Sequence, residues 1–384
     1  MITINDYIEA NKYSTILNDI KSLRKTNKFS IDKRNSNRYR VVIKDSIEYT
    51  AYCFSTPIYN IDNRNLVVHE FKSNKNGYFY KCSNALISIY KNICILENKE
   101  GRCITSLNES PIISEKKQGT KSNIIITPTL NGLRFWVNGD KISLNLKSEI
   151  KQHGIRFHST CFSVMSENFK PFVSIACLYA SDGNGTVSPV ELKYKDVGNQ
   201  TYELSFSHDV PNGSFFFEVN LYEPKLFQDT TVESLHPDAN NAYGAVGFIG
   251  KTNQFGEQWL YSRPDFSKIS DLNSQRIEKA LLHIPILNGS TENVDVYIPE
   301  KRFCSFGSTW NKKINATTKA ATSNNNGKYL TIDVTAMYTN RTEHTLVYNE
   351  GLILRKPKGK NNYVAISTGD CYSAPQILEI KFKN

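Results

Sequence analysis

The run IEKALLHI at residues 277–284 decides the fold class. Ala280, Leu282 and Ile284 alternate with the residues between them, so one face of an extended chain through this run is apolar and buried. The run FFFEV at residues 215–219 has the aromatic and β-branched side chains that favour strands. Both runs therefore predict β-strands that contribute to a hydrophobic core.

Short strand-like runs of the same kind extend through the rest of the chain. They begin at Tyr39 and are separated by turn sequences such as Asn76-Gly77 and Asn131-Gly132. Tyr and Phe account for 21 and 20 of the 384 residues, and both suit the half-buried surface of a sheet. Many short strands at close spacing predict an all-β fold of tandem β-sandwiches.

Residues 5–23 are expected to form a short N-terminal α-helix. Apolar side chains recur there at helical spacing, and Asn5 or Asp6 can cap the helix start. The apolar stripe of such a helix has to be buried, either on its own domain or on a neighbouring subunit. The basic, polar stretch that follows favours the neighbouring subunit.

Groups of strands divide the chain into three expected domains. Residues 1–150 combine the N-terminal helix with a β-rich attachment domain, residues 151–227 form a small Ig-like β-sandwich, and residues 228–384 form a larger β-sandwich. Within these domains, residues 85–96 are expected to form one strand and residues 317–328 a polar surface loop.

The charge and hydropathy of the chain restrict its partners. The net charge is +10, but the Lys and Arg residues are scattered, and the densest group, between Lys21 and Arg40, fits a solvated helix end and linker. No apolar run approaches the ~20 residues of a membrane span, and the N-terminus lacks the pattern of a secretory signal. We therefore expect no nucleic-acid partner, no membrane insertion and synthesis in the cytoplasm.

The cysteines do not have the spacing of a metal site. None of them forms a C-x-x-C pair, so zinc is not expected. Several lie inside apolar runs, which indicates buried thiols that act as small hydrophobic side chains, with disulfides as the alternative. The eight are Cys53, Cys82, Cys94, Cys103, Cys161, Cys177, Cys304 and Cys371.

Motifs of catalysis are absent from the sequence. There is no glycine-rich phosphate loop and no Gly-x-Ser-x-Gly nucleophile motif. No pair of carboxylates stands out as the acid and nucleophile of a glycosidase, although the spacing that defines such a pair is spatial. We therefore predict no catalytic residue and no cofactor, and expect a protein that is not an enzyme.

Six ordered blocks in the last part of the chain resemble the DNRLRE domain family. The resemblance covers residues 228–384 and implies a jelly-roll β-sandwich similar to carbohydrate-binding modules. The family's naming motif is poorly kept, because YSRPDF at residues 261–266 stands where an Arg-Phe-Asp strand is usual. The blocks are residues 228–233 with 237–244 (QDTTVE, PDANNAYG), 277–284 with 294–297 (IEKALLHI, VDVY), Trp310, 332–335 (IDVT), 349–354 (NEGLIL), and 365–367 with 373–378 (AIS, SAPQIL).

The run YCFSTPIYN at residues 52–60 resembles an N-terminal region that accompanies such domains in prophage proteins of low-GC Gram-positive bacteria, Clostridium-like ones especially. Together the resemblances imply a virion structural protein assembled in the host cytoplasm, as a tail fibre, baseplate or head-decoration component. The implied partners are other virion proteins, further copies in a homo-oligomer and a host cell-wall glycan. A cell-surface glycan-binding adhesin or receptor-binding protein is one alternative, and a cell-wall hydrolase is another.

Calcium is the ion that the sequence favours, because β-sandwich modules often hold it with carboxylate and carbonyl oxygens. The candidate ligands, near the ends of the expected jelly roll, are Glu233, Asp238 and Asp370.

Sugar binding would use aromatic rings exposed on a face or at a loop tip. Each aromatic residue considered also fits a structural role, and Trp310 reads as a core anchor. The candidates for a glycan site are Tyr243, Trp259, Tyr261 and Tyr372.

Overall fold

The computed structural model describes residues 30–31, 39–45, 48–56, 71–82, 85–113, 123–129, 131–182, 187–269, 271–272, 276–289, 292–316, 318–339, 350–357, 362–371 and 374–382. These residues form two compact units. The central unit comprises the described residues between 71 and 223, and the terminal unit comprises those between 30 and 56 together with those from 224 onward. The helix predicted for residues 5–23 lies outside the described residues.

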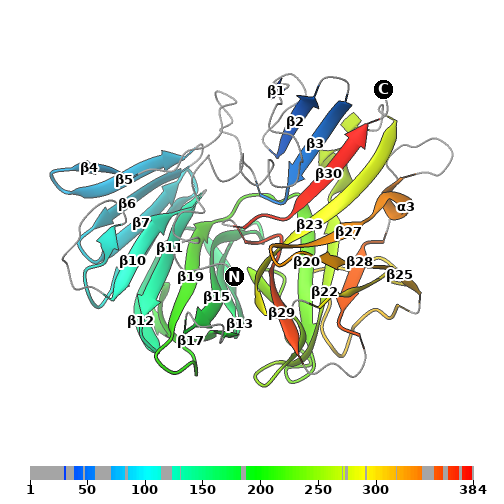
Figure 1. Ribbon diagram of the computed structural model, residues 1–384. Helices are drawn as coiled ribbons and strands as arrows, with labels where there is room; N and C mark the ends of the chain where they lie inside the picture. Colours follow the sequence, from blue (N-terminus) through cyan, green and yellow to red (C-terminus); the bar gives the residue numbers. More distant parts are fainter. Residues whose placement is uncertain are drawn as a thin grey trace. The chain divides into compact units, whose positions relative to one another are not determined.

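Two sheets form the central unit (Figure 1). We call the first the outer-face sheet. It has the order β17 (Glu191–Gly198), β18 (Thr201–Ser207), β12 (Lys141–Glu149), β8 (Gly101–Leu107), β7 (Ile93–Asn98), β6 (Ala85–Tyr90), β5 (Gly77–Cys82) and β4 (Lys72–Asn74). The second sheet has the order β13 (Gln152–His158), β14 (Cys161–Ser166), β15 (Pro171–Ser181), β19 (Ser214–Leu221), β11 (Gly132–Asn138), β10 (Ile124–Pro128) and β9 (Ile112–Ile113), with β16 (Val187–Ser188) beside β15.

Side chains from both sheets share one hydrophobic core. Ile87 and Leu96 contribute from the outer-face sheet, and Phe135 and Phe217 contribute from the second sheet. The rings of Phe135 and Phe217 are stacked, with centroids 4.6 Å and planes 3° apart. Two sheets around a common apolar layer make this unit a β-sandwich, in agreement with the predicted fold class.

The shared core groups the chain differently from the three domains expected from the sequence. Strand β12 ends at Glu149 in one sheet and β13 begins at Gln152 in the other, so the expected boundary after residue 150 falls inside a single unit. The physical reason is that neither sheet can bury its apolar face without the other. The expected boundary near residue 227 is close to the division at 223–224.

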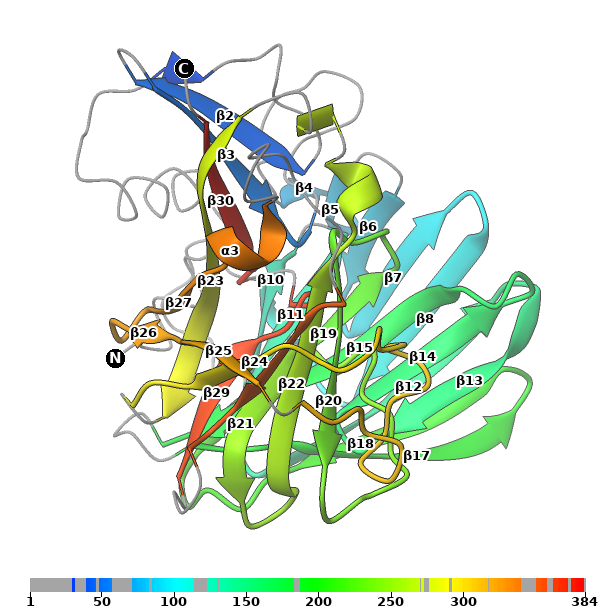
Figure 2. The same cartoon turned by 90° about the vertical axis from the view of Figure 1, so that its right-hand side faces the viewer.

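The terminal unit is built from strands at both ends of the chain. One group has the order β1 (Ser30–Ile31), β2 (Arg40–Asp45), β3 (Glu48–Phe54), β30 (Ile377–Phe382), β23 (Ile277–Gly289), β27 (Tyr329–Asp333) and β26 (Asn324–Asn325). The other contains β29 (Tyr363–Ser367), β21 (Val246–Thr252), β22 (Gly256–Pro264), β20 (Phe227–Glu233), β28 (Leu352–Arg355), β24 (Asp295–Tyr297) and β25 (Lys319–Thr322). Figure 2 shows β29, β21, β22 and β20 next to one another.

Strand β23 links the two groups. It pairs with β30 and β27 along its first part and with β29 at its end, with a register shift between Ile286 and Asn288. Ala280, Leu282 and Ile284 are fully buried in the core between the groups, which confirms the alternation read from the sequence. The jelly-roll connectivity implied for this part of the chain stays a prediction.

The N-terminal strands complete the C-terminal sheet. Strand β30, drawn in red, lies between β3 in blue and β23 in yellow (Figure 1). Cys53 on β3 lies opposite Leu378 on β30, and the backbone N–H of Ser55 donates to the carbonyl oxygen of Gln376 at 2.9 Å. Residues 39–45 and 48–56 therefore belong with the C-terminal strands, although the sequence placed them in the first domain.

Cys53→Ser tests whether β3 is buried in a hydrophobic core. The Cys53 side chain is fully buried in the core of the terminal unit. A serine hydroxyl at this position would lose its hydrogen bonds to water, and the apolar surroundings offer it no replacement. We expect the free energy of unfolding to fall by about 1–3 kcal/mol, measured by denaturant unfolding. The exposed Cys304 provides a matched control, and Cys304→Ser should leave stability unchanged. Equal effects of the two substitutions would contradict the burial of Cys53.

Two local predictions are corrected by the structure. Residues 85–96 form the hairpin of β6 and β7 because Lys91, with φ of 55°, turns the chain. Residues 317–328 are not all loop, because β25 pairs with β24 and β26 pairs with β27 there.

The only α-helix in the described part is α3 (Thr335–Tyr338), after β27 (Figure 2). No described helix is long and apolar enough to cross a membrane.

The cysteine side chains follow the interpretation as small hydrophobes. Seven of the eight are buried, and Cys53, Cys94 and Cys103 pack within the hydrophobic cores of their units.

Candidate ligand-binding site

Two loops of the terminal unit are fastened to each other. The first follows β20 and spans residues 234–245, and the second follows β24 and spans residues 298–318. The Asn240 side-chain amide donates to the carbonyl oxygens of Ser305 and Ser308, at 2.6 and 2.9 Å. Asn311 donates from its backbone to the carbonyl oxygen of Pro237 at 2.9 Å. These bonds hold the loops in one arrangement without a strand between them.

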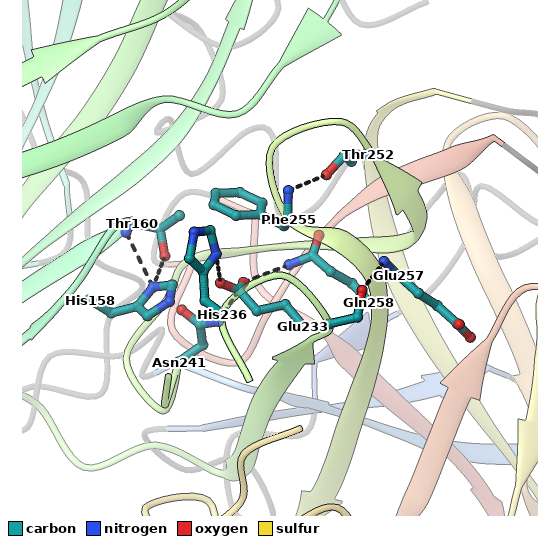
Figure 3. Close-up of polar contacts among 10 residues, drawn as sticks. His158, Thr160, Glu233, His236, Asn241, Thr252, Phe255, Glu257 and Gln258 are labelled. Carbon is teal, nitrogen blue, oxygen red and sulfur yellow. Dashed lines mark hydrogen bonds and ion pairs between the residues drawn. The ribbon is translucent and has the colours of Figure 1, made fainter. Parts of the chain in front are cut away.

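A buried carboxylate anchors the first loop. Glu233, the last residue of β20, is fully buried and accepts hydrogen bonds from His236 Nδ1 at 2.7 Å, Asn241 Nδ2 at 3.1 Å and Gln258 Nε2 at 3.1 Å (Figure 3). A buried carboxylate is tolerated only when donors of this kind replace its water. The loop is therefore folded around Glu233.

The imidazole of His236 lies between this anchor and solvent. Its side chain is 45% exposed, and its ring meets that of Phe255 edge-on with centroids 5.8 Å apart (Figure 3). The bond to Glu233 fixes the tautomer and orientation of the ring, as a carboxylate commonly does for a histidine.

Aromatic and cationic side chains gather on the second loop and on the face of the sheet below it. The indoles of Trp259 and Trp310 have centroids 5.2 Å apart, and Lys313 Nζ lies 4.4 Å from the Trp310 ring centroid. The Arg355 guanidinium lies 4.6 Å from the Trp259 centroid and 3.7 Å from that of Tyr297. Cation–π contacts of this kind orient the rings.

The two loops also expose large apolar side chains. Phe306 is 51% exposed and its ring lies 5.3 Å from that of Tyr243, while Leu235 is 58% exposed. Trp310 is half-buried. We call the side chains of Leu235, Tyr243, Phe306, Trp310 and Lys313 the loop surface. Exposed aromatic groups on a rigid support, with polar groups beside them, are typical of ligand-binding sites.

The structure separates the glycan candidates that the sequence predicted. Tyr243 belongs to the loop surface and Trp259 packs against its Trp310 ring, and both are mostly buried, at 6% and 9% exposed. Tyr261 is fully buried, and its hydroxyl donates to the carbonyl oxygen of Ile314 at 2.7 Å, so its ring cannot stack on a ligand. Tyr372 lies outside the described residues. The sequence predicted that Trp310 anchors the core, and it gave no reason to select Phe306. In the structure, both rings reach the surface.

The structure gives each candidate calcium ligand a protein partner. Glu233 holds its three donors, Asp238 accepts from Asn311 Nδ2 at 3.0 Å, and Asp370 forms an ion pair with Lys225. Across the stretches that the structure describes, no group of three or more His, Cys, Asp or Glu side chains is placed to hold a metal ion.

A second buried carboxylate lies on the same strand as Glu233. Asp229 accepts the backbone N–H of Gly369, and its buried Oδ1 has no hydrogen-bond partner among the described residues. Burial raises the pKa of Asp229 to about 7, against the lowering effects of the Gly369 N–H and of Lys225. Asp229 therefore keeps its proton to a higher pH in the fold than in the unfolded chain.

Comparison with known proteins adds no relative. No protein-family model matches the chain, and no curated protein matches it either. Membership of the DNRLRE domain family thus stays a prediction from the six sequence blocks, and the loop surface has to be interpreted from its own chemistry.

Proposed function

We propose that this chain is a non-enzymatic structural protein of a phage-like particle whose terminal unit presents a glycan-binding surface. The observation that carries the proposal is the loop surface. Phe306 and Trp310 are displayed on a loop that is fastened by Asn240 and Asn311. A rigid aromatic surface loses little conformational entropy when it binds, which suits repeated contact with a polymer.

The hydrogen bonds around Glu233 support a structural role for that residue. Its two carboxylate oxygens accept from three side-chain donors, and two of those donors are the amides of Asn241 and Gln258. A carboxylate with this many donors organises the loop that carries Tyr243. Placement in a particle is supported by the resemblance of residues 52–60 to prophage proteins and by the succession of β-sandwich folds.

A pull-down on purified cell walls tests the binding half of the proposal. The double variant Phe306→Ala/Trp310→Ala is expected to bind at least about tenfold more weakly, because truncating central aromatic side chains of an interface typically costs more than about 1.4 kcal/mol. Phe169→Ala is the matched control, since Phe169 is 67% exposed but belongs to the central unit. Equal binding by the unmodified chain, the double variant and Phe169→Ala would contradict a site at the loop surface.

A cell-surface adhesin would use the same loop surface, so location separates the two functions. Purified particles that lack the chain, together with wall binding that depends on Phe306 and Trp310, would favour the adhesin. Clearing of cell walls in a zymogram would contradict the non-enzymatic assignment.

A further inference from the structure

The outer-face sheet of the central unit carries an apolar patch on the side that faces away from its core. Ile87, Ile89 and Leu96 point into the core, so the residues that alternate with them point outward. Three of the outward residues are large, apolar and exposed: Leu86 at 42%, Tyr90 at 37% and Ile93 at 38%. The apolar patch comprises Phe79, Leu86, Tyr90, Ile93, Ile95 and Ile104.

Strand register groups the members of the patch around the small, buried side chain of Ser88. Ile93 lies directly opposite Tyr90, and Ile95 lies opposite Ile104 on one side and Ser88 on the other. Phe79 in turn lies opposite Ser88. Directly opposed side chains have Cβ atoms about 5 Å apart, so these groups touch or nearly touch. Figure 2 shows β5, β6, β7 and β8 following one another across the sheet. Contiguous exposed apolar patches mark interaction sites.

Charged residues flank the patch in a pattern that is complementary to itself. Leu86 on β6 lies opposite Glu97 on β7 and opposite Lys81 on β5. Glu97 and Lys81 are both exposed. They lie level with each other along the strand direction, one on each side of β6. A rotation of 180° about an axis along β6 therefore exchanges an acidic position with a basic one.

We propose that this face binds a second copy of the chain, with the two-fold axis running along β6. The axis places Leu86, Ser88 and Tyr90 against the same residues of the second copy. It also places β7 of one copy over β5 of the other, so that Ile95 faces Phe79 and Glu97 faces Lys81 of the second copy. Both contacts occur twice, as in any isologous interface.

The alternative axis along the perpendicular direction fits the residues less well. It would place Glu97 over Ile93 of the second copy, so that each buried carboxylate faces an apolar group, whereas the axis along β6 gives Glu97 an opposite charge, Lys81, to face. The axis along β6 also keeps the strands of the facing sheets nearly aligned, which is the common packing of two sheets about 10 Å apart.

Charge exchange tests the proposal. We expect the full chain to have twice its monomer mass in analytical ultracentrifugation. Glu97→Lys and Lys81→Glu should each raise the dimer dissociation constant at least tenfold, because each places like charges face to face. The double variant Glu97→Lys/Lys81→Glu should restore dimers to within threefold of the unmodified chain. These positions are exposed, so folding is expected to survive, and circular dichroism checks it.

A monomer at concentrations of tens of micromolar would overturn the proposal. So would a dimer that neither single substitution weakens, or a double variant that dissociates as readily as the single ones. Lys195→Glu is the control for net charge, since Lys195 is exposed on β17 of the same sheet but lies outside the apolar patch. A Lys195→Glu chain that loses its dimer as fully as Lys81→Glu would also overturn it.

Discussion

Glu218→Ala is expected to lower the free energy of unfolding by about 3–5 kcal/mol. Arg134 on β11 lies directly opposite Glu218 on β19, with Nη2 and Oε1 2.9 Å apart, and their side chains are 2% and 0% exposed. Asn220 also donates to Glu218 at 3.0 Å. Removing the carboxylate leaves the Arg134 charge buried without its counter-ion, and that uncompensated charge produces the loss.

A double variant and a matched pair separate this cost from a general loss of packing. Arg134→Met/Glu218→Leu removes both charges and should recover most of the stability, because an apolar pair of similar volume needs no counter-ion. Arg102 and Glu149 are also directly opposed across two strands, but their side chains are 50% and 29% exposed. Glu149→Ala should therefore change stability little. Denaturant unfolding measures all three, and equal losses at Glu149 and Glu218 would contradict the argument.

Asp229→Asn is expected to stabilise the terminal unit at pH 8 and to leave its stability at pH 4 nearly unchanged. Burial raises the pKa of Asp229 from 3.8 to about 7. The folded state therefore keeps a proton that the unfolded chain releases near pH 4, so stability falls as the pH rises from 4 to 7. At about 1.4 kcal/mol for each pKa unit, the fall reaches about 4 kcal/mol.

The neutral asparagine removes this titration. Its stability should be flat over the pH interval in which the unmodified chain loses stability through Asp229. The exposed Asp140, in the central unit, provides the control Asp140→Asn, which should retain the full pH dependence. Urea unfolding between pH 4 and 8 measures the difference, and parallel curves for Asp229→Asn and the unmodified chain would show that Asp229 is ionised in the fold.

The alternation of apolar and polar residues predicted the fold class because this alternation depends only on residues that are close together in the sequence. Residues 277–284 alternate, and the structure buries Ala280, Leu282 and Ile284 as that alternation requires. The run at residues 215–219 shows the limit of the same argument. Phe216 and Glu218 face away from the core that holds Phe215 and Phe217, yet all four are buried. Alternation identifies two faces but cannot say whether the second is also covered.

Long-range pairing explains what the sequence did not predict. The side-chain hydroxyl of Ser55 accepts from the backbone of Gln376, which is 321 residues away, and no local pattern indicates such a partner. The turn at Lys91 and Asn92 was missed for a different reason. Asn92 is a typical turn residue, but the apolar side chains on both sides of it read as one continuous strand, and the sequence does not predict that Lys91 adopts a φ of 55°.

The candidate site was only partly visible in the sequence. Aromatic type alone nominated Tyr243, which belongs to the loop surface, and Trp259, whose ring packs against that of Trp310. It could not separate Tyr261, which is buried, from Phe306, which is exposed. Exposure depends on how the second loop covers the face of β22, and that packing is decided by contacts such as those of Asn240 with Ser305 and Ser308.

The composition of purified particles tests the central claim most directly. Particles released from the host and separated from soluble protein should contain this chain at a fixed ratio to the major structural protein, as measured by quantitative mass spectrometry. The ratio should stay constant from one preparation to the next and through washing with high salt. Particles that are intact and infectious but contain none of the chain would contradict its assignment as a structural component.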